Sequence, residues 1–390
     1  MISNISIKNF KSVVDVSLPL GRFNLLIGAN GCGKSNILEG IAMGAAASSN
    51  KLDYEYFANR GMRVVEPQLM LPAFDGINTD YISIDATDKL AAAFSCKLHY
   101  NSESKPAKWV DGSMSFYELI SFLKERTNVE HGRVSDLVES LEELRGKQGD
   151  DVVLNIRVSP NEKGFSIMTA IPDLEQFLIY SLEESKLRQA DDSNRTYPLG
   201  RHGEGLFAYL KELAQRSDAL DIFNEIKDNL KVLDWFDDMQ VPSGQLSNEF
   251  NLKLKDSYLA ETINIFDQRS TNEGFLYLLF YLTLIISDET PRFFAIENID
   301  TAFNPKLCRE VTRRLIELAR KHNKQIIATT HNPAVLDGMD LYEDDVRLHV
   351  VRRSIDGYTK TNRVTLKGDM TMPLSEAWQK GFIGGLPDNF

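Results

Sequence analysis

A glycine-rich run near the start of the chain carries the residue types of a phosphate-binding loop. Its sequence, GANGCGKS from Gly28 to Ser35, fits the spacing G-x-x-x-x-G-K-[ST]. In such a loop the glycines let backbone N–H groups turn towards phosphate oxygens, and the following helix adds the positive end of its dipole. We expect Lys34 to reach the β- and γ-phosphates of a nucleoside triphosphate and the Ser35 hydroxyl to bind Mg²⁺. The other residues of the predicted phosphate cradle are Asn30, Gly31, Cys32, Gly33 and Asn36.

Polar residues follow two apolar runs in the C-terminal part of the chain. The run RFFAIE places four apolar residues directly before the carboxylate of Glu297. A magnesium ion on nucleotide phosphates takes oxygen ligands of this kind. The pattern also fits a buried strand that simply ends in glutamate. A later apolar run, Gln325–Thr329, is followed by Thr330 and His331. The ends of these two runs are the candidate second half of the nucleotide site.

The segments around these residues alternate between strand and helix patterns. An apolar strand over Phe23–Ile27 precedes the glycine-rich run and a helix over Ile37–Ala47 follows it, which separates a phosphate loop from a chance match. Alternation of this kind favours an α/β fold with a parallel sheet. The other expected strands are Ile2–Ile7, Val13–Leu18, Phe293–Ile296, Gln325–Thr329, Val346–Arg352 and Thr361–Leu366, and the other expected helices are Asn272–Ser287 and Pro305–His322.

A long segment separates the two halves of the expected nucleotide-binding domain. We assign residues 1–50 and 260–370 to that domain, 51–259 to an inserted α+β or helical lobe, and 371–390 to a C-terminal tail. The tail is apolar for its position, so we expect it to dock on its own sheet or on another chain. Within the lobe, strand patterns cover Tyr81–Ile84, Ala93–Tyr100 and Val152–Val158, and helix patterns cover Phe116–Arg126, Val134–Leu144, Leu174–Arg188 and Leu206–Asn229.

Composition narrows the class of protein. The 390 residues are 43% hydrophobic and 26% charged, and the most apolar stretch, Phe275–Ile286, is too short to span a membrane. Residues 1–10 do not form a signal peptide, and the three scattered cysteines indicate no disulfide framework, so we expect a cytoplasmic protein. The net charge of −12 argues against a broadly basic surface. A local basic run from Arg313 to Lys321 is either a solvated helix face or a contact for a partner or DNA.

Together these motifs resemble ABC-type ATPase heads of the RecF/SMC/OLD-like branch, often described as AAA-type ATPases of bacterial defence systems and including PtuA-like ATPases. The run IENIDTAFNP from Ile296 to Pro305 is similar to the family pattern I-D-E-P-E-x-G-L-H-P. The resemblance places Glu297 at the magnesium-site acid, Asn298 at the catalytic glutamate and Asp300 at the later acid. It also places His331 at the switch histidine, which contacts the γ-phosphate. The opening IKNFKS, ending at Ser12, resembles the family's start I-x-N-F-[KR]-[SC].

The family also has a signature segment, S-x-G or S-[DE]-G, that reaches the γ-phosphate in a second subunit. The run STNEG ending at Gly274 resembles it, with Asn272 where serine is usual. An amide can donate to a phosphate oxygen, and Asn272 is equally suited to cap a helix. The family's metal-sensing glutamine has a candidate in Gln68.

The resemblance implies an α/β head with a mixed sheet and flanking helices that binds ATP and Mg²⁺ and forms a homodimer or higher homo-oligomer through ATP. Asn298 cannot accept a proton at neutral pH, so we expect weak hydrolysis, unless Asp300 takes over that role. The implied function is a sensor or scaffold that controls a separate effector, a nuclease or toxin, in anti-phage defence. DNA or a phage component is a possible further partner, and a membrane is not. The alternatives are a stand-alone RecF-like ATPase that repairs DNA or binds DNA ends, a transporter subunit, which the absence of LSGGQ disfavours, and an inert ATP-stabilised structural subunit.

Overall fold

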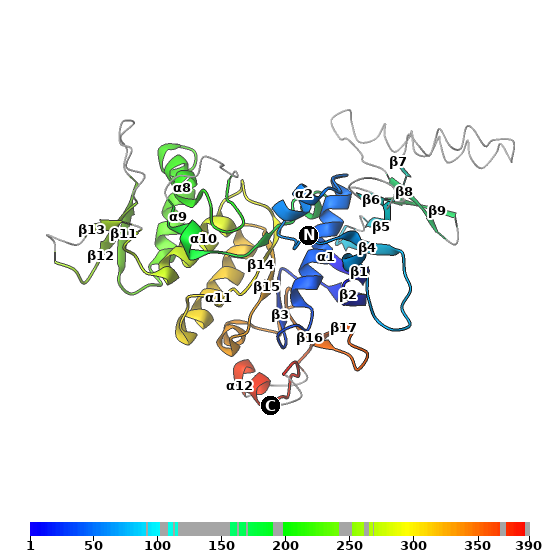
Figure 1. Cartoon of the computed structure of the whole chain (residues 1–390). Coiled ribbons are helices and arrows are strands. Elements are labelled where there is room, and N and C mark those ends of the chain that lie inside the picture. Colours follow the sequence, from blue (N-terminus) through cyan, green and yellow to red (C-terminus); the bar gives the residue numbers. More distant parts are fainter. Residues whose placement is uncertain are drawn as a thin grey trace.

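A six-stranded sheet forms the centre of the protein (Figure 1). The computed structural model describes residues 1–90, 93–101, 108–111, 114–115, 157–161, 164–168, 171–189, 198–241, 252–260, 265–267, 269–366 and 372–386. The strand order is β10 (Ile179–Tyr180), β14 (Phe293–Ile296), β15 (Gln325–Thr329), β3 (Phe23–Ile27), β16 (Val346–Arg353) and β17 (Thr359–Val364). All neighbours are parallel except β16 and β17. The loops after β14, β15 and β3 therefore leave the same edge of the sheet.

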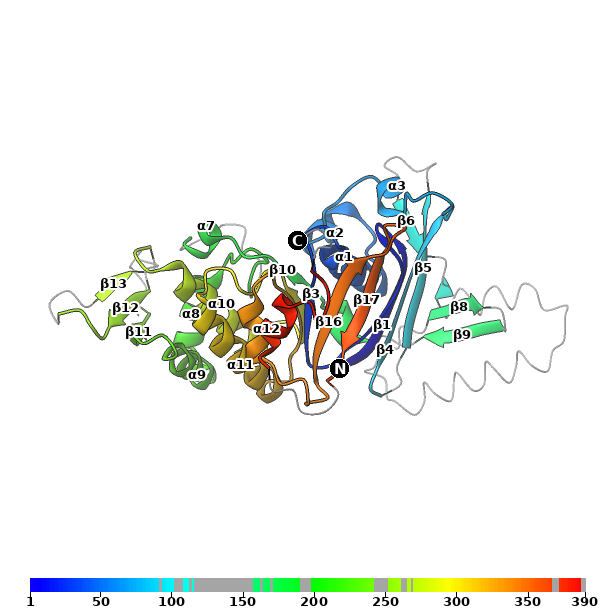
Figure 2. The ribbon, with the colours of Figure 1, turned by 90° about the horizontal axis from the view of Figure 1, so that it is seen from below.

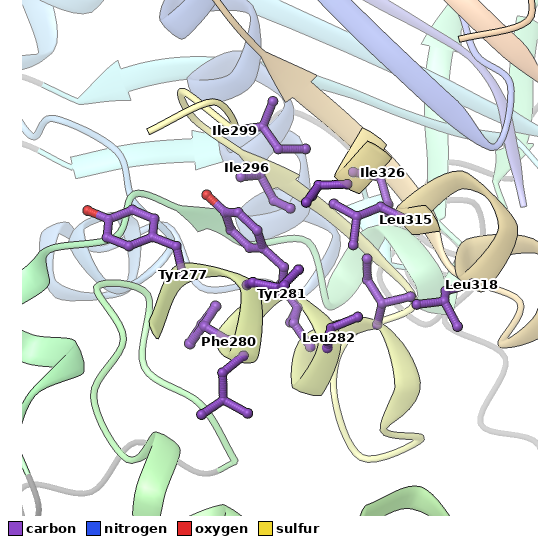
Figure 3. Packing of buried hydrophobic residues seen from close by; sticks show 14 of the residues in the cluster. Tyr277, Phe280, Tyr281, Leu282, Ile296, Ile299, Leu315, Leu318 and Ile326 are labelled. Atoms are coloured by element: carbon purple, nitrogen blue, oxygen red, sulfur yellow. The ribbon is translucent and has the colours of Figure 1, made fainter. Parts of the chain in front are cut away.

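The central strands are mostly apolar because both faces of the sheet are covered. Every residue of β3, β14 and β15 is buried. On one face, Phe294 and Ile296 of β14 pack with α10 (Glu273–Ile286) and α11 (Pro305–Lys321). Figure 3 shows Tyr281 and Leu282 of α10 packed beside Leu315 of α11. On the other face, Phe293 and Ala295 pack with α1 (Lys34–Ser48).

A second, antiparallel sheet lies across α1 from the first. Its order is β2 (Val13–Pro19), β1 (Ile2–Phe10), β4 (Tyr81–Asp88), β5 (Ala93–Asn101) and β6 (Lys108–Asp111). Two glycines of α1 bring the helix close to this sheet, since a Cβ on Gly44 would lie 2.7 Å from Ile84 Cγ2 and one on Gly40 would lie 2.9 Å from Ile7 Cδ1. Seen from below, β17 of the first sheet lies next to the β1–β2 hairpin of the second sheet, and this contact joins the two sheets (Figure 2).

Parts of segment 51–259 are built into these two sheets. β4 is hydrogen-bonded to β1, and β10 is hydrogen-bonded to β14. The division into a head and an inserted lobe stays a prediction, but these strands of the segment complete the sheets of the head. The helix expected over Leu174–Arg188 is wrong: the segment contains α6 (Pro172–Glu175), the strand β10 and α7 (Glu184–Leu187). Short apolar runs do not distinguish strand from helix by periodicity, and pairing with β14 decides for strand here.

The remaining expectations differ mostly in their boundaries. The helix expected over Leu206–Asn229 is broken into α8 (Leu206–Gln215) and α9 (Leu220–Leu230). The helix and strand expectations between residues 116 and 156 lie outside the described residues, and only the end of Val152–Val158 falls in β8 (Arg157–Asn161). No described helix is both long enough and apolar enough to cross a membrane. The other elements are α2 (Tyr54–Asn59), α3 (Pro67–Met70), β7 (Met114–Ser115), β9 (Gly164–Met168), β11 (Phe236–Gln240), β12 (Lys253–Asp256), β13 (Ile265–Asp267), the 3-10 helix η1 (Pro333–Gly338) and α12 (Leu374–Gln379).

Candidate nucleotide-binding site

The glycine-rich run forms a tight loop between β3 and α1, against β16 and β17. Gly28 has a φ of 151°, and a Cβ there would lie 2.1 Å from the carbonyl oxygen of Val351. Gly33 has a φ of 109°, and a Cβ there would lie 2.0 Å from Thr359 Oγ1. Only glycine combines such backbone angles with such close approach. These two glycines are therefore required by the packing of the loop as well as by phosphate binding.

The side chain of Lys34 points back into this loop. Its Nζ donates hydrogen bonds to the carbonyl oxygens of Gly28 at 2.7 Å and Ala29 at 3.1 Å. Burial is the main cause that lowers the pKa of Lys34, while the Cys32 thiol and the Glu297 carboxylate act in the opposite direction. The other acceptor of Lys34 Nζ is the Cys32 sulfur at 3.9 Å, and a partly desolvated ammonium with such neutral acceptors gains strongly from phosphate oxygens. The position of Lys34 suits the role expected from the sequence.

Ser35 and Glu297 meet across the end of the sheet. Ser35 Oγ donates to Glu297 Oε1 at 2.6 Å, although 262 residues separate them in the chain. Glu297 is held from behind by β10, because its backbone N–H donates to the carbonyl oxygen of Tyr180 at 2.9 Å. A hydroxyl and a carboxylate at this distance fit Mg²⁺, which is commonly bound by one or two carboxylates together with phosphates and water. Among the residues that the structure describes, no group of three or more His, Cys, Asp or Glu could hold a metal ion.

His331 and Asp300 lie on the loops next to this pair. Thr330 Oγ1 donates to Asp300 Oδ1 at 2.6 Å, which fixes Asp300 beside the end of β15. His331 lines a cavity together with Gly28 and Asn30 of the phosphate loop. Partial burial is the main cause that lowers the pKa of His331, the ammonium of Lys34 adds to it, and Asp300 opposes it. The imidazole is therefore neutral near pH 7 and lies at the open side of the phosphate loop.

Asn298 has an unusual backbone conformation as well as an unexpected residue type. Its φ is 51°, in the left-handed region that asparagine tolerates better than most residues. Its N–H donates to Thr329 Oγ1 at 2.9 Å, and its carbonyl oxygen accepts from Thr301 N at 3.0 Å. The loop ends with a second left-handed residue, Ala302 (φ 69°), at the position of the family pattern's glycine. The backbone of this loop is thus one reason for asparagine at position 298.

The signature candidate lies at a different place on the molecule. Asn272 Oδ1 accepts from Phe275 N at 2.8 Å, so Asn272 caps α10 as expected for that alternative. A Cβ on Gly274 would lie 3.0 Å from the carbonyl oxygen of Ala302, which leaves room only for glycine or a small shift. Asn272 and Gly274 line a cavity of about 350 Å³ that shares no residue with the cavities at the phosphate loop. Within one chain, these residues line a different cavity from Asn30 and His331.

Two further predicted positions have contrasting surroundings. Asn36 Nδ2 donates to Ser12 Oγ at 2.7 Å, and Asn36 Oδ1 accepts from Arg63 Nη2 at 3.1 Å, so Asn36 connects the phosphate helix to the opening motif. Gln68 is exposed on α3, and the described residues show no hydrogen bond between it and Ser35 or Glu297. Its role as a metal ligand stays a prediction.

Thr359 holds the phosphate loop from outside and was not expected from the sequence. Its Oγ1 donates to the carbonyl oxygen of Cys32 at 3.0 Å and shares a hydrogen bond of 2.7 Å with Ser12 Oγ. Arg353 acts similarly, since its Nε donates to the carbonyl oxygen of Gly31 at 2.9 Å. No local sequence pattern marks Thr359 or Arg353, whereas Ser12 stands in the quoted opening motif.

Comparison with known proteins agrees with this fold. The family described as "AAA ATPase domain" matches residues 1–288, well over half of the chain. A solved structure described as an SMC head bound to the C-terminal winged-helix domain of ScpA is 14% identical, with a TM-score of 0.54 over 95% of this chain and 99% of that chain. No curated protein matches the chain. Two further SMC head structures, from Thermotoga maritima and Pyrococcus furiosus, are each 13% identical, with TM-scores of 0.47 and 0.48, and cover 94% and 97% of this chain and 99% and 98% of theirs.

At such low identity the likeness concerns the fold alone. The fold expected from the sequence, an α/β ATPase head with a mixed sheet and flanking helices, is confirmed. The fold likeness to an SMC head agrees with the fold that the resemblance to the RecF/SMC/OLD-like branch implied.

Proposed function

The chain belongs to the AAA ATPase domain family, and on that premise we propose that it binds Mg-ATP in a site completed by a second copy of itself. The observation that carries the proposal is the hydrogen bond of Ser35 to Glu297 directly beside the phosphate loop. Lys34 supplies the charge for the β- and γ-phosphates, and Ser35 and Glu297 supply oxygen ligands for Mg²⁺. Calorimetric titration with Mg-ATP tests it: the wild type binds, and Lys34→Ala loses binding.

The completion by a second copy rests on the position of the signature candidate. Asn272 and Gly274 line a cavity separate from that of Asn30 and His331, so one chain alone does not cover its own γ-phosphate with them. In a dimer, Asn272 of one copy meets the nucleotide of the other, and ATP joins the two copies. Light scattering after gel filtration tests this: ATP with Mg²⁺ shifts the wild type to a dimer, whereas Gly274→Asp stays monomeric while still binding ATP. A dimer that forms equally well without nucleotide contradicts it.

Hydrolysis at this site is slow. An amide at the position of the catalytic glutamate cannot take the proton of the attacking water, and general-base catalysis is worth about 10²–10⁴ in rate. Asp300, the nearest substitute, accepts a hydrogen bond from Thr330. A slow site keeps the closed dimer present for long periods, and the closed state then acts as a signal.

The signal controls a separate effector, a nuclease or a toxin, in anti-phage defence. This assignment is supported by the resemblance to defence-system ATPases and by a slow, ATP-joined dimer, which suits a sensor better than a motor. Co-purification with the product of a neighbouring nuclease or toxin gene, in the presence of ATP but not ADP, tests it. Equal recovery of the effector with both nucleotides would argue against the signal.

A RecF-like DNA-end-binding ATPase ranks second because the basic run on α11 is largely neutralised. Arg313 pairs with Glu310, Arg320 with Glu343 and Asp345, and Lys321 with Glu225. Cations already paired within the chain release fewer counterions from DNA and contribute less to binding. Tight, salt-dependent binding of the purified protein to DNA ends would reverse this ranking.

A further inference from the structure

The C-terminal segment, residues 372–386, is docked on the head next to the phosphate loop. Leu374, Ala377 and Trp378 are buried, at the spacing of one helix face, and α12 packs against η1. The carboxylate of Asp337 accepts from Ser375 N at 2.9 Å and from Ser375 Oγ at 2.7 Å. The described part of the tail thus packs on its own chain, against η1.

The turn after α12 comes into contact with the first residue of the phosphate loop. Gly385 has a φ of 84°, and a Cβ there would lie 2.8 Å from Val350 Cγ1 and 3.6 Å from Gly28 Cα. Its neighbour Gly384 has almost the same φ, 83°, but a Cβ there would meet nothing within 4 Å. The absence of a side chain at 385 therefore lets the segment approach Val350 of β16, beside the loop, whereas at 384 glycine serves the backbone angle alone.

Two cavities lie beside this contact, each lined by both the segment and the phosphate loop. The smaller one, about 240 Å³, lies between Asn30 and His331 on the head and Trp378 and Gln379 on the segment. The larger one, about 650 Å³, has Arg352, Arg353 and Lys380 in its lining together with Asn30 and Gln379. Cavities of this combined size accommodate part or all of a small ligand, and the basic side chains favour an anionic one.

A polar atom in this wall lacks a partner. Trp378 is 4% exposed, and its Nε1 has no hydrogen-bond partner among the described residues. Trp378 lines the smaller cavity, and its Nε1 would lie 3.8 Å from a Cβ on Gly385. A buried N–H without a partner is costly, and an acceptor such as a phosphate oxygen or an ordered water removes that cost.

We propose that residues 372–386 form the part of the wall on the γ-phosphate side that the chain supplies itself, in addition to the signature segment of the second copy, and make the protein prefer ATP to ADP. Gln379 is the contact residue, with its side-chain amide as a donor towards the terminal phosphate or a water on it. Trp378 is a positioning residue that holds Gln379 and the Gly384–Gly385 turn in place, and its unpartnered N–H lies next to that turn. The inference rests on the proposed binding of ATP at the phosphate loop.

The test compares the dissociation constants of Mg-ATP and Mg-ADP for the full chain by calorimetry. Gly385→Ala clashes with Val350 and so displaces the turn from the sheet beside Gly28, and Gly384→Ala is its matched control, with a similar backbone cost but no clash. Hydrogen bonds to charged groups correspond to about tenfold or more in affinity. We expect Gly385→Ala and Gln379→Ala to weaken the affinity for Mg-ATP about tenfold and the affinity for Mg-ADP less than about twofold. Gly384→Ala should leave the ratio of ATP affinity to ADP affinity unchanged.

Trp378→Phe keeps most of the packing and removes only the N–H. If this variant has a lower ratio of ATP affinity to ADP affinity than the wild type, the indole N–H contributes to nucleotide binding. The inference is overturned if Gly385→Ala and Gln379→Ala both keep the ratio of Gly384→Ala. Because Gln379 is exposed, its variant remains informative even where Gly385→Ala does not fold. If the wild type binds neither nucleotide, or Lys34→Ala binds both as well as the wild type does, the proposed ATP site itself is wrong. That outcome is distinct from a wild type that binds ATP and ADP equally well, which overturns the wall alone.

Discussion

Replacing Asn298 by glutamate restores a general base at the position where the resemblance puts one. Asn298 directly follows Glu297 at the start of the loop and is exposed, so a longer side chain has space on the solvent side. The gain expected from a positioned base is about 10²–10⁴ in rate, equivalent to about 3–5 kcal/mol of transition-state stabilisation. The substitution should lower the free energy of unfolding, because the φ of 51° is unfavourable for glutamate by about 1 kcal/mol.

The assay is phosphate release at saturating Mg-ATP, together with thermal unfolding. We expect Asn298→Glu to raise kcat about 100-fold and to lower the free energy of unfolding by about 1 kcal/mol. Asn298→Gln is the matched control, since it has the same backbone cost without a carboxylate, and it should lose stability without gaining rate. If Asn298→Glu hydrolyses ATP no faster than Asn298→Gln, residue 298 is not the position of the base. A wild type that hydrolyses tens of ATP per second would refute slow hydrolysis directly.

Three other predictions concern charge and protonation. Glu297→Gln removes a ligand charge from the expected Mg²⁺ site. The ATP affinity of this variant, measured by calorimetry, should therefore be nearly the same with Mg²⁺ as with EDTA, and an unchanged effect of Mg²⁺ places the metal elsewhere. The pKa of His331 is lowered in the free protein, and the negative phosphates of bound ATP should raise it. The ATP affinity of the wild type should therefore increase, relative to that of His331→Gln, as pH falls from 8 to 6. Parallel pH profiles of the two proteins would contradict this. His349, on β16, has its pKa lowered to about 4, first by burial and then by Arg347 and Arg363. The unfolded chain therefore binds the proton first, and the free energy of unfolding should fall as pH drops from about 6.5 to about 4. His349→Leu should flatten that slope in urea titrations, and an unchanged slope would mean that other groups cause it.

The sequence by itself determined those parts of the site that are encoded by neighbouring residues. A phosphate loop needs its glycines, lysine and serine at fixed spacing between one strand and one helix, so eight consecutive residues identify it. The apolar runs before Glu297 and His331 indicate buried parallel strands, and strands of this kind carry their polar residues to a common edge. α10 was equally clear, because a helix that is apolar on every side has to be buried.

Only the tertiary structure decided which distant residues support that site. β10 holds the backbone of Glu297, yet its two residues carried no periodicity of their own and were expected to be helical. Thr359 holds Cys32 across 327 residues, and Gly385 packs against Gly28 from the far end of the chain. Such contacts depend on how the sheets pack around α1, and packing selects residues by shape and hydrogen bonding rather than by a local pattern. The sequence therefore specifies the phosphate loop, while the fold specifies the wall around it.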